Sequence, residues 1–467
     1  MMKKQAAASN QITEGVIWKQ LLLFFFPILF GTFFQQLYNT TDAVIVGNFV
    51  GKEALAAVGG PSATIINLLV GFFVGLSSGA TVIISQYYGA EDKNRVSEAV
   101  HTAIALAIAG GAVMTVIGIA VSGFSLSAMN TPADILGPSL TYMRIYFLGT
   151  IPSMIYNMGS GILRAVGDSK RPLYFLIASC FINIVLDLFF VVVLQMGVAG
   201  AAIATILSQT LSALMTVVAL MRASDSYRLI LTRIRFHKVH LFNIVKIGLP
   251  AGLQSAMYSI SNLLIQSSIN SFGTDTVAAW TAYGKIDGLF WMIMSAYGVS
   301  ITTFAGQNFG AGKYERVKKS VRVCLGLAAF TSVLLSFIVV TFGGTILLLF
   351  TRDAQVISIC EGIIRLVAPT YITYICIEIL SGTCRGCGDS FIPMILTCFG
   401  VCVLRIVWIF VAVPLRNDIS TVVFSYPLTW AITSILFVIY YKKGRWMQKD
   451  SITDAPGTQK ESRGTTA

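Results

Sequence analysis

Two carboxylates and their polar neighbours are the residues of this sequence whose types and spacing suit ion chemistry. Asp42 lies in the segment TTDAVIVG, which contains no other charged residue. Asp187 follows Asn183 by four residues, a spacing that places both side chains on one face of a helix. Thr205, farther along the chain, adds a hydroxyl group. Together these groups could bind a sodium ion through oxygen atoms, or two close carboxylates could share one proton.

The same residues allow a simpler interpretation. Asp42 could cap the outer end of a helix, and Asp187 could hydrogen-bond only to its neighbours on the same helix. The residues by themselves favour the two interpretations equally. Their environment matters, because a charge in the middle of a membrane costs roughly 2.5–3.5 kcal/mol and needs a reason to be there.

Composition places the chain in a membrane. Of its 467 residues 55% are hydrophobic and 12% are charged, and its mean hydropathy is +0.76. Soluble domains carry about 25% charged residues, so a soluble fold of this size would lack the polar residues to cover its surface. The net charge of +12 is typical of basic cytoplasmic loops, and no nucleic-acid partner is expected.

The hydrophobic runs predict an all-α integral membrane protein. A helix that crosses a bilayer needs ~20 mostly apolar residues, and the first two of the runs found are so long that these helices are expected to tilt, bend or protrude. Runs broken by polar or by Gly- and Pro-containing connections give twelve predicted spans, at residues 16–48, 54–85, 97–123, 135–160, 171–195, 198–222, 243–271, 277–306, 318–349, 356–381, 392–414 and 420–441.

The distribution of basic residues predicts the orientation. If the N-terminus is cytoplasmic, the inward connections hold most of the loop lysines and arginines, whereas the outward ones hold only Lys52, Arg352 and Arg416. This asymmetry follows the positive-inside rule. The sequence therefore predicts a multi-pass protein of the cell membrane, in contact with lipid, monomeric, and with both termini cytoplasmic.

The two halves of the chain repeat each other. Gln307 in GQNFGAGK follows Gln86 in SQYYGAED by 221 residues, and Arg385 follows Arg164 by the same interval within matching RxxGDS segments. Each half holds six predicted spans, so both halves enter the membrane in the same direction and form two pseudo-symmetric six-helix bundles around a central cleft. The predicted segments are a cytoplasmic N-terminal segment (1–15), an N-lobe (16–222), a cytoplasmic inter-lobe linker (223–242), a C-lobe (243–441) and a cytoplasmic tail (442–467).

Two further features concern the connections and the long helices. The basic linker could fold as an amphipathic helix on the inner leaflet. Pro27 and Pro250 lie in the first and seventh spans, and a proline inside a helix removes one backbone hydrogen bond. Both helices are therefore expected to bend there.

The order and spacing of these motifs resemble the multidrug and toxic compound extrusion (MATE) family, in a bacterial-type form. The resemblance rests on twelve spans in two lobes, on TTDAVIVG, SQYYGAED, GQNFGAGK and LRAVGDSKRP, and on NIVLD and GVAGAAIAT in spans five and six. It covers residues 14 to 441. It implies a secondary active exporter of drug-like, often cationic compounds, driven by antiport of protons or sodium ions through alternating access.

The resemblance also decides between the two interpretations of the N-lobe acids. Asp42, Asn183, Asp187 and Thr205 match the family's cation site in the first lobe, so they are the candidate coupling residues. No metal is expected beyond transported Na⁺ at that site, and no cofactor. The positions 221 residues after Asn183 and Asp187 hold leucine and tryptophan, which confines the site to the first lobe.

Other polar residues of the spans are candidate contacts. The resemblance implies substrate contacts on one face of span one, and these four residues could line the cleft there and on span four: Gln35, Tyr38, Asn39 and Asn157. Amides and phenols also join helices within membrane bundles. In the second lobe, Lys285 or Arg405 paired with Glu378 is expected to form a buried structural ion pair rather than a second coupling site.

The sequence holds no catalytic motif. It has no GxxxxGK[ST] phosphate loop, and its three histidines do not form HExxH. We therefore expect a transporter and not an enzyme. The main alternative is a flippase for lipid-linked saccharides from the same superfamily, whose pyrophosphate-bearing substrate would require several basic residues in the cavity.

Overall fold

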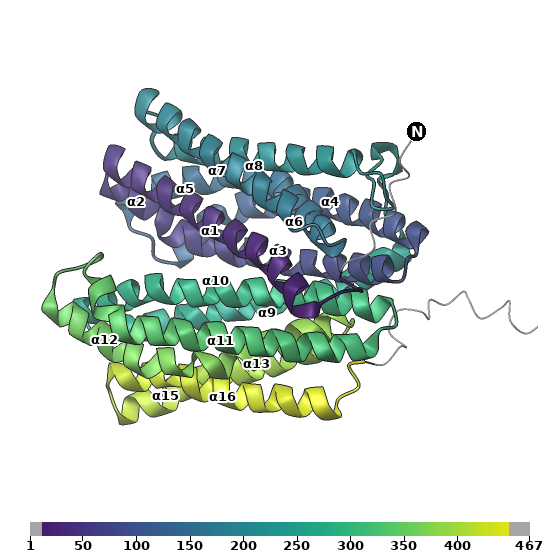
Figure 1. Ribbon diagram of the computed structural model, residues 1–467. Helices are drawn as coiled ribbons and strands as arrows, with labels where there is room; N and C mark the ends of the chain where they lie inside the picture. Colours follow the sequence, from purple (N-terminus) through teal and green to yellow (C-terminus); the bar gives the residue numbers. More distant parts are fainter. Residues whose placement is uncertain (1–11, 448–467) are drawn as a thin grey trace, which may run out of the picture.

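The computed structural model describes residues 12–447, and their regular secondary structure is entirely helical (Figure 1). The first half contains α1 (Ile17–Phe49), α2 (Lys52–Gly59), α3 (Pro61–Gly89), α4 (Lys93–Ala128), α5 (Ala133–Leu148), α6 (Thr150–Ala165), α7 (Lys170–Asp187), a π-helix (Leu188–Val193) and α8 (Gly197–Met221). The second half contains α9 (Lys238–Asn270), α10 (Thr274–Gly310), α11 (Tyr314–Leu347), α12 (Ala354–Val367), α13 (Tyr371–Gly386), α14 (Phe391–Thr397), a π-helix (Cys398–Val403), α15 (Leu404–Leu415) and α16 (Ile419–Lys443).

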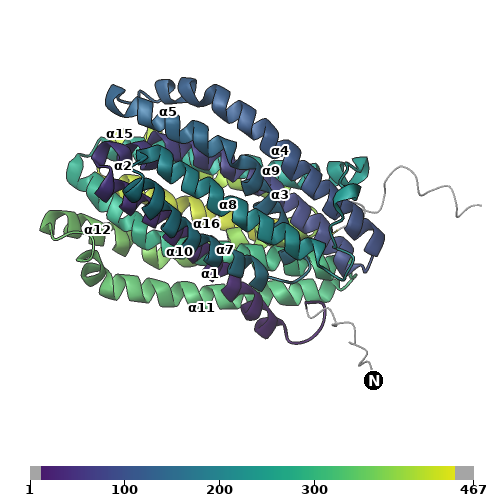
Figure 2. The ribbon, with the colours of Figure 1, turned by 90° about the horizontal axis from the view of Figure 1, so that it is seen from above.

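The helices form two bundles. In Figure 1 α1–α8, coloured purple to teal, lie above α9–α16, coloured teal-green to yellow, and Figure 2 shows the first set overlying the second. We call these the N-lobe and the C-lobe. The lobes meet mainly where α3 packs against α9 and α10, and where α1 packs against α10. The predicted fold class, an all-α membrane protein built of two pseudo-symmetric six-helix bundles, is confirmed.

Each of the twelve predicted spans is helical, although their internal structure varies. Ten helical segments of the described residues are long and apolar enough to cross a membrane. The fourth span does not qualify because Gly149 divides it into α5 and α6, which have 16 residues each. Helix α9 is the other exception: it has 33 residues but carries many serines and amides. The second span is also divided, at Gly60 between α2 and α3.

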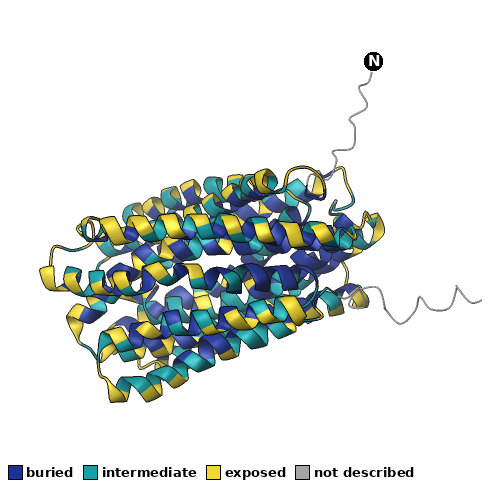
Figure 3. Cartoon of the chain, turned by 60° about the horizontal axis from the view of Figure 1, so that its bottom comes forward, coloured by how far each residue is buried: buried dark blue, intermediate teal, exposed yellow. Residues whose placement is uncertain are grey.

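The surface is apolar where it would face lipid. Phe124, Phe330 and Phe410 are 76%, 68% and 69% exposed, whereas Asn183 and Asp187 are fully buried. Figure 3 shows exposed positions along the outer faces of the helices and buried ones between them. This distribution is the reverse of that of a soluble protein, and it fits a bundle whose outer face contacts acyl chains.

The 221-residue repeat is visible in the helix ends. Gly167 after α6 and Gly388 after α13 have φ angles of 95° and 100°, a left-handed conformation that glycine adopts without a Cβ clash. The aspartate that follows each glycine caps the next helix. Asp168 Oδ1 accepts hydrogen bonds from the backbone N–H groups of Lys170 and Arg171 at 3.2 and 3.1 Å. Each lobe therefore turns into its fifth span in the same way.

The linker does not form the expected amphipathic helix. Residues 223–237 contain only a three-residue 3-10 turn, Leu231–Arg233, and α9 begins at Lys238. Polar side chains of α4 bind the linker backbone instead: the N–H groups of Ile230 and His237 donate to His101 Nε2 and Thr102 Oγ1, at 3.0 and 3.2 Å. These bonds replace the internal hydrogen bonds of a helix, so that expectation was wrong.

The limits of the five predicted segments and the cytoplasmic location of both termini stay predictions. Residues 1–11 of the N-terminal segment and 448–467 of the tail lie outside the described residues. Below, the inner end is the end of the molecule at which α1 begins and α3 ends, and the outer end is the opposite one; the names follow the predicted orientation.

Candidate functional site

The structure brings the four candidate coupling residues together. Asp42 comes from α1, Asn183 and Asp187 from α7, and Thr205 from α8. Thr205 Oγ1 donates to Asp42 Oδ2 at 3.3 Å, and Asn183 and Asp187 lie beside Asp42. All four side chains are buried, and none is more than 5% exposed.

Helix geometry positions these side chains. Asn183 and Asp187 are one α-helical turn apart at the end of α7, and a π-helix begins directly after Asp187. Such π segments are frequent at functional sites because they rotate the following residues relative to the preceding face. Helix α1 packs against α7, the π-helix and α8. The carboxylate of Asp42 therefore faces the C-terminal end of α7 and the first half of α8.

The cluster has more acceptors than donors. Asp42 Oδ1, both carboxyl oxygens of Asp187 and both polar side-chain atoms of Asn183 have no hydrogen-bond partner within residues 12–447. A buried polar atom without a partner costs about 1–3 kcal/mol, and more when it is charged. A proton on one carboxyl group would supply a donor to the other, and a sodium ion would be coordinated by the same oxygens. The oxygen atoms of this cluster suit either a shared proton or a coordinated sodium ion.

A large cavity adjoins this cluster between the lobes. It measures about 1000 Å³, and Asp42 is part of its wall. All four candidate substrate contacts line it: Gln35, Tyr38, Asn39 and Asn157. Their role in binding stays a prediction. The analysis of the sequence missed further polar lining residues, which the same search for polar groups within spans could have found: Asn67, Tyr142, Tyr146 and Gln209.

Lys285 is not the buried charge that the sequence suggested. It is exposed on α10 and lines the inter-lobe cavity. The expected ion pair with Glu378 does not form in the described part of the chain, because Glu378 accepts a hydrogen bond from Tyr374 at 3.1 Å instead. The rotation of α10 about its own axis explains why Lys285 is exposed and not buried, because it turns this side chain toward the cleft between the lobes.

Arg405 is buried, as expected, but no carboxylate among residues 12–447 forms an ion pair with it. It is 2% exposed, and its guanidinium carbon lies 4.0 Å from the centre of the Tyr426 ring. It also donates to Thr429 at 3.4 Å. The cation–π contact with Tyr426 stabilises the desolvated Arg405. Neither Lys285 nor Arg405 forms the predicted ion pair with Glu378, so that prediction was wrong.

The sequence indicated a buried charge at Asp287 of the C-lobe, but not the aromatic donors that surround it. Asp287 accepts hydrogen bonds from Tyr283 and Tyr371 at 2.9 and 2.7 Å, and from Trp291 Nε1 at 2.7 Å. Tyr283 and Trp291 stand four residues before and after Asp287, a helical spacing that the sequence already displays. Every oxygen of Asp287 has a donor, in contrast to the oxygens of Asp187. The oxygens of Asp187 therefore have more capacity to coordinate an ion than those of Asp287.

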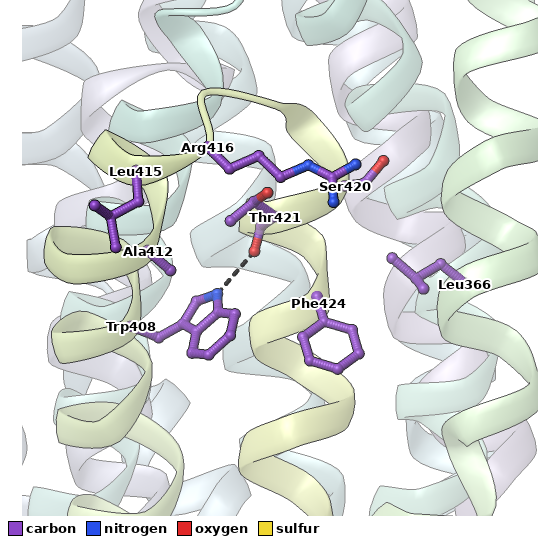
Figure 4. Close-up of a pocket in the computed structure, with 8 residues that line it drawn as sticks. All are labelled: Leu366, Trp408, Ala412, Leu415, Arg416, Ser420, Thr421 and Phe424. Atoms are coloured by element: carbon purple, nitrogen blue, oxygen red, sulfur yellow. Dashed lines mark hydrogen bonds between the residues drawn. The ribbon is translucent and has the colours of Figure 1, made fainter.

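The C-lobe equivalent of the coupling position is apolar. Trp408, 221 residues after Asp187, donates its indole N–H to the backbone oxygen of Thr421 at 2.8 Å. Figure 4 shows it beside Phe424 in a cavity of about 490 Å³ whose lining residues come from α12, α15, α16 and the turn at Arg416. No N-lobe residue lines that cavity. It therefore lies outside the cleft between the lobes.

Two glutamines close the inner end of the cleft in a reciprocal arrangement. Gln86 Nε2 of the N-lobe donates to the carbonyl oxygen of Gly386 at 2.7 Å, and Gln307 Nε2 of the C-lobe donates to that of Ala165 at 2.6 Å. Donors and acceptors are each related by the 221-residue repeat. We call this pair of bonds the inner clasp. With the cavity at the outer half of α1, it defines a transporter conformation that is closed at the inner end.

The fold and these sites are those of a helical membrane transporter. The family model MatE matches residues 27–189 and 250–411, once in each lobe. The chain therefore belongs to the MatE (MATE) family of transporters, as the motifs predicted. The two matched stretches confirm the internal repeat.

Known proteins resemble the chain over nearly its whole length. It is 27% identical over 447 residues to the probable multidrug resistance protein YoeA of Bacillus subtilis, covering 94% of this chain and 96% of the relative. It is 29% identical over 445 residues to the probable multidrug resistance protein YpnP of the same organism, covering 95% and 98%. A MOP superfamily transporter structure from Pyrococcus furiosus superposes with a TM-score of 0.87 at 23% identity, covering 94% and 98%. The last similarity concerns the fold.

Proposed function

We propose that this protein is a secondary active exporter of drug-like, often cationic compounds, driven by antiport of protons or sodium ions. The observation that carries the proposal is the pair of buried carboxylates, Asp42 and Asp187, with unpartnered oxygens beside a cavity of about 1000 Å³. A cavity of this size suits a drug-sized ligand. The names of the two Bacillus relatives, as probable multidrug resistance proteins, support the same substrate class.

Asp42 is the group that couples ion and substrate in this proposal. It lines the cavity and also contacts the buried cluster, so one carboxylate faces both ligands. In a low-dielectric site a cationic compound and a proton or sodium ion compete for that charge. Ion entry from outside would release the compound outward, and reopening of the inner clasp would then return the site to the cytoplasm.

Efflux from membrane vesicles tests the proposal. A fluorescent cationic dye is loaded into vesicles, and the pH gradient and the sodium gradient are imposed separately. Accelerated dye movement under one gradient and not the other identifies the coupling ion. Dye movement that neither gradient changes, relative to vesicles without the protein, would contradict antiport.

Pro27→Ala is expected to slow transport more than it weakens substrate binding. Pro27 lies inside α1, which runs unbroken from Ile17 to Phe49, and the missing backbone hydrogen bond permits a bend at that turn. Alanine restores the bond and stiffens the helix that carries Asp42. Vesicle efflux rates and equilibrium dye binding to purified protein measure the two effects. Pro250→Ala makes the same change in α9, a helix that carries none of the four coupling residues, and should slow transport less. Equal loss of rate and affinity in Pro27→Ala would mean that Pro27 only packs.

The flippase alternative has one observation in its favour. Lys52 and Lys285 both line the cavity, and basic residues are what a pyrophosphate-bearing lipid would need. Two lysines, one of them in the first turn of α2 at the outer end, are few for such a substrate, and the cavity wall also carries Asp42. We therefore rank drug export first.

A further inference from the structure

Lys285 is a charged residue at membrane depth that forms no ion pair with any of residues 12–447. It is exposed in the inter-lobe cavity, and no ion pair or hydrogen bond engages its ammonium group within residues 12–447. At 1.5 Å per residue it lies about 16 Å along α10 from Thr274. A lysine at such a depth in a bilayer is costly, and it is retained where a cavity and a partner compensate the charge.

The cavity wall separates the two signs of charge. Asp42 is the only carboxylate among the described residues that line it, and it belongs to the N-lobe. Lys285 is the only lining residue from the C-lobe. Asp42 lies about 10 Å along α1 from Phe49, so the two charges line one cavity from different lobes. Lys52, in the first turn of α2, is at the outer mouth.

The rest of the wall is suited to an amphiphile. The lining includes both amide side chains and apolar residues, among them Gln35, Asn67, Val70 and Gln209. A compound with an apolar body would contact the aliphatic wall, and each charged group of a zwitterion would meet the opposite charge of the protein. A purely cationic compound would be attracted to Asp42 but repelled by Lys285.

We infer that Lys285 forms an anion subsite in this cavity, so that the transporter prefers amphiphiles carrying a carboxylate or phosphate, above all zwitterions whose cationic group meets Asp42. The inference rests on the proposed function, because it concerns the substrate class of the same cavity. The alternative role for Lys285 is a side chain that is merely hydrated by the water of the cleft.

Two dyes with the same body test the subsite. Rhodamine B carries a carboxylate beside its cationic xanthene, and its ethyl ester keeps the cation but lacks the anion. Fluorescence anisotropy gives the Kd of each dye for the purified full-length protein in detergent. The wild type should bind rhodamine B more tightly than the ester, and Lys285→Gln should reduce this preference about tenfold. Lys285→Arg should keep the preference.

Lys246→Gln is the matched control, because Lys246 is an exposed lysine of α9 that does not line this cavity. It should leave the ratio of the two Kd values as in the wild type. A ratio that Lys285→Gln does not change would overturn the anion subsite and leave only a hydrated lysine.

Two further measurements distinguish this inference from the proposed function. Gradient-driven efflux of the ethyl ester by the wild type, together with an unchanged Kd ratio in Lys285→Gln, would support export and overturn the subsite. Binding of farnesyl pyrophosphate that requires Lys285, with no transport of either dye, would support the subsite and overturn drug export in favour of an anionic lipid.

Discussion

Asp187→Asn is expected to reduce gradient-driven efflux to the rate of passive leak while the protein still folds and inserts. The asparagine side chain has nearly the same shape as the carboxylate, but it cannot take up a proton or balance a sodium ion. Asp187 is fully buried and both of its oxygens lack a partner in the described residues. The side-chain amide of the introduced asparagine can also donate a hydrogen bond to Asp42, which stabilises the folded cluster.

The measurement compares initial efflux rates in vesicles with matched amounts of inserted protein. Asp134→Asn, an exposed aspartate in the first turn of α5, is a control for the same chemical change and should transport normally. Glu378→Gln should also retain transport, because Tyr374 already hydrogen-bonds Glu378. Normal efflux by Asp187→Asn would mean that the N-lobe cluster is not the coupling site.

The sequence predicted those features that local pattern and repetition determine. Asn183 and Asp187 share a helical face because of their four-residue spacing, and any model of α7 places them together. The 221-residue repeat related Gln86 to Gln307 and Gly167 to Gly388 before their roles in the inner clasp and the helix ends were visible. Repeated residues occupy repeated backbone environments, so these predictions need no knowledge of how helices contact one another.

The orientation of single side chains around the cleft could not be predicted from the sequence. Lys285 was expected to be buried and paired, because hydropathy cannot distinguish a helix face toward a water-filled cleft from one toward a neighbouring helix. Helix rotation decides between them, and in α10 it turns Lys285 to the cavity and Asp287 into its aromatic cluster. The prediction of a helix in the linker was wrong for a related reason. Hydrogen bonds from the linker backbone to His101 and Thr102, which are distant in sequence, outweigh its local helical pattern.

A second large effect is expected at Gly310, at the inner end of the cleft. Valine at this position is expected to prevent closure of the inner end and to reduce efflux at least tenfold. A Cβ atom on Gly310 would overlap the carbonyl oxygen of Gln86, and one on Gly89 would overlap that of Gln307. Both contacts cross the lobe interface beside the inner clasp, and both involve backbone, which cannot move aside as a flexible side chain could. The lobes must therefore separate at this end.

Spin labels on opposite lobes measure the separation. Lys93→Cys on α4 and Lys319→Cys on α11 place labels at exposed inner-end positions, in a background where the half-exposed Cys376 and Cys398 are replaced by serine. Gly310→Val should shift the label distance to longer values, whereas Gly326→Val, with no neighbouring atom within 4 Å of its Cβ position, should not. Unchanged distances in Gly310→Val would show that the interface tolerates the added atoms. Close packing of Gly310 against Gln86 would then not be needed for closure on that side, and the alternation of access would have to be controlled elsewhere along α3 and α9.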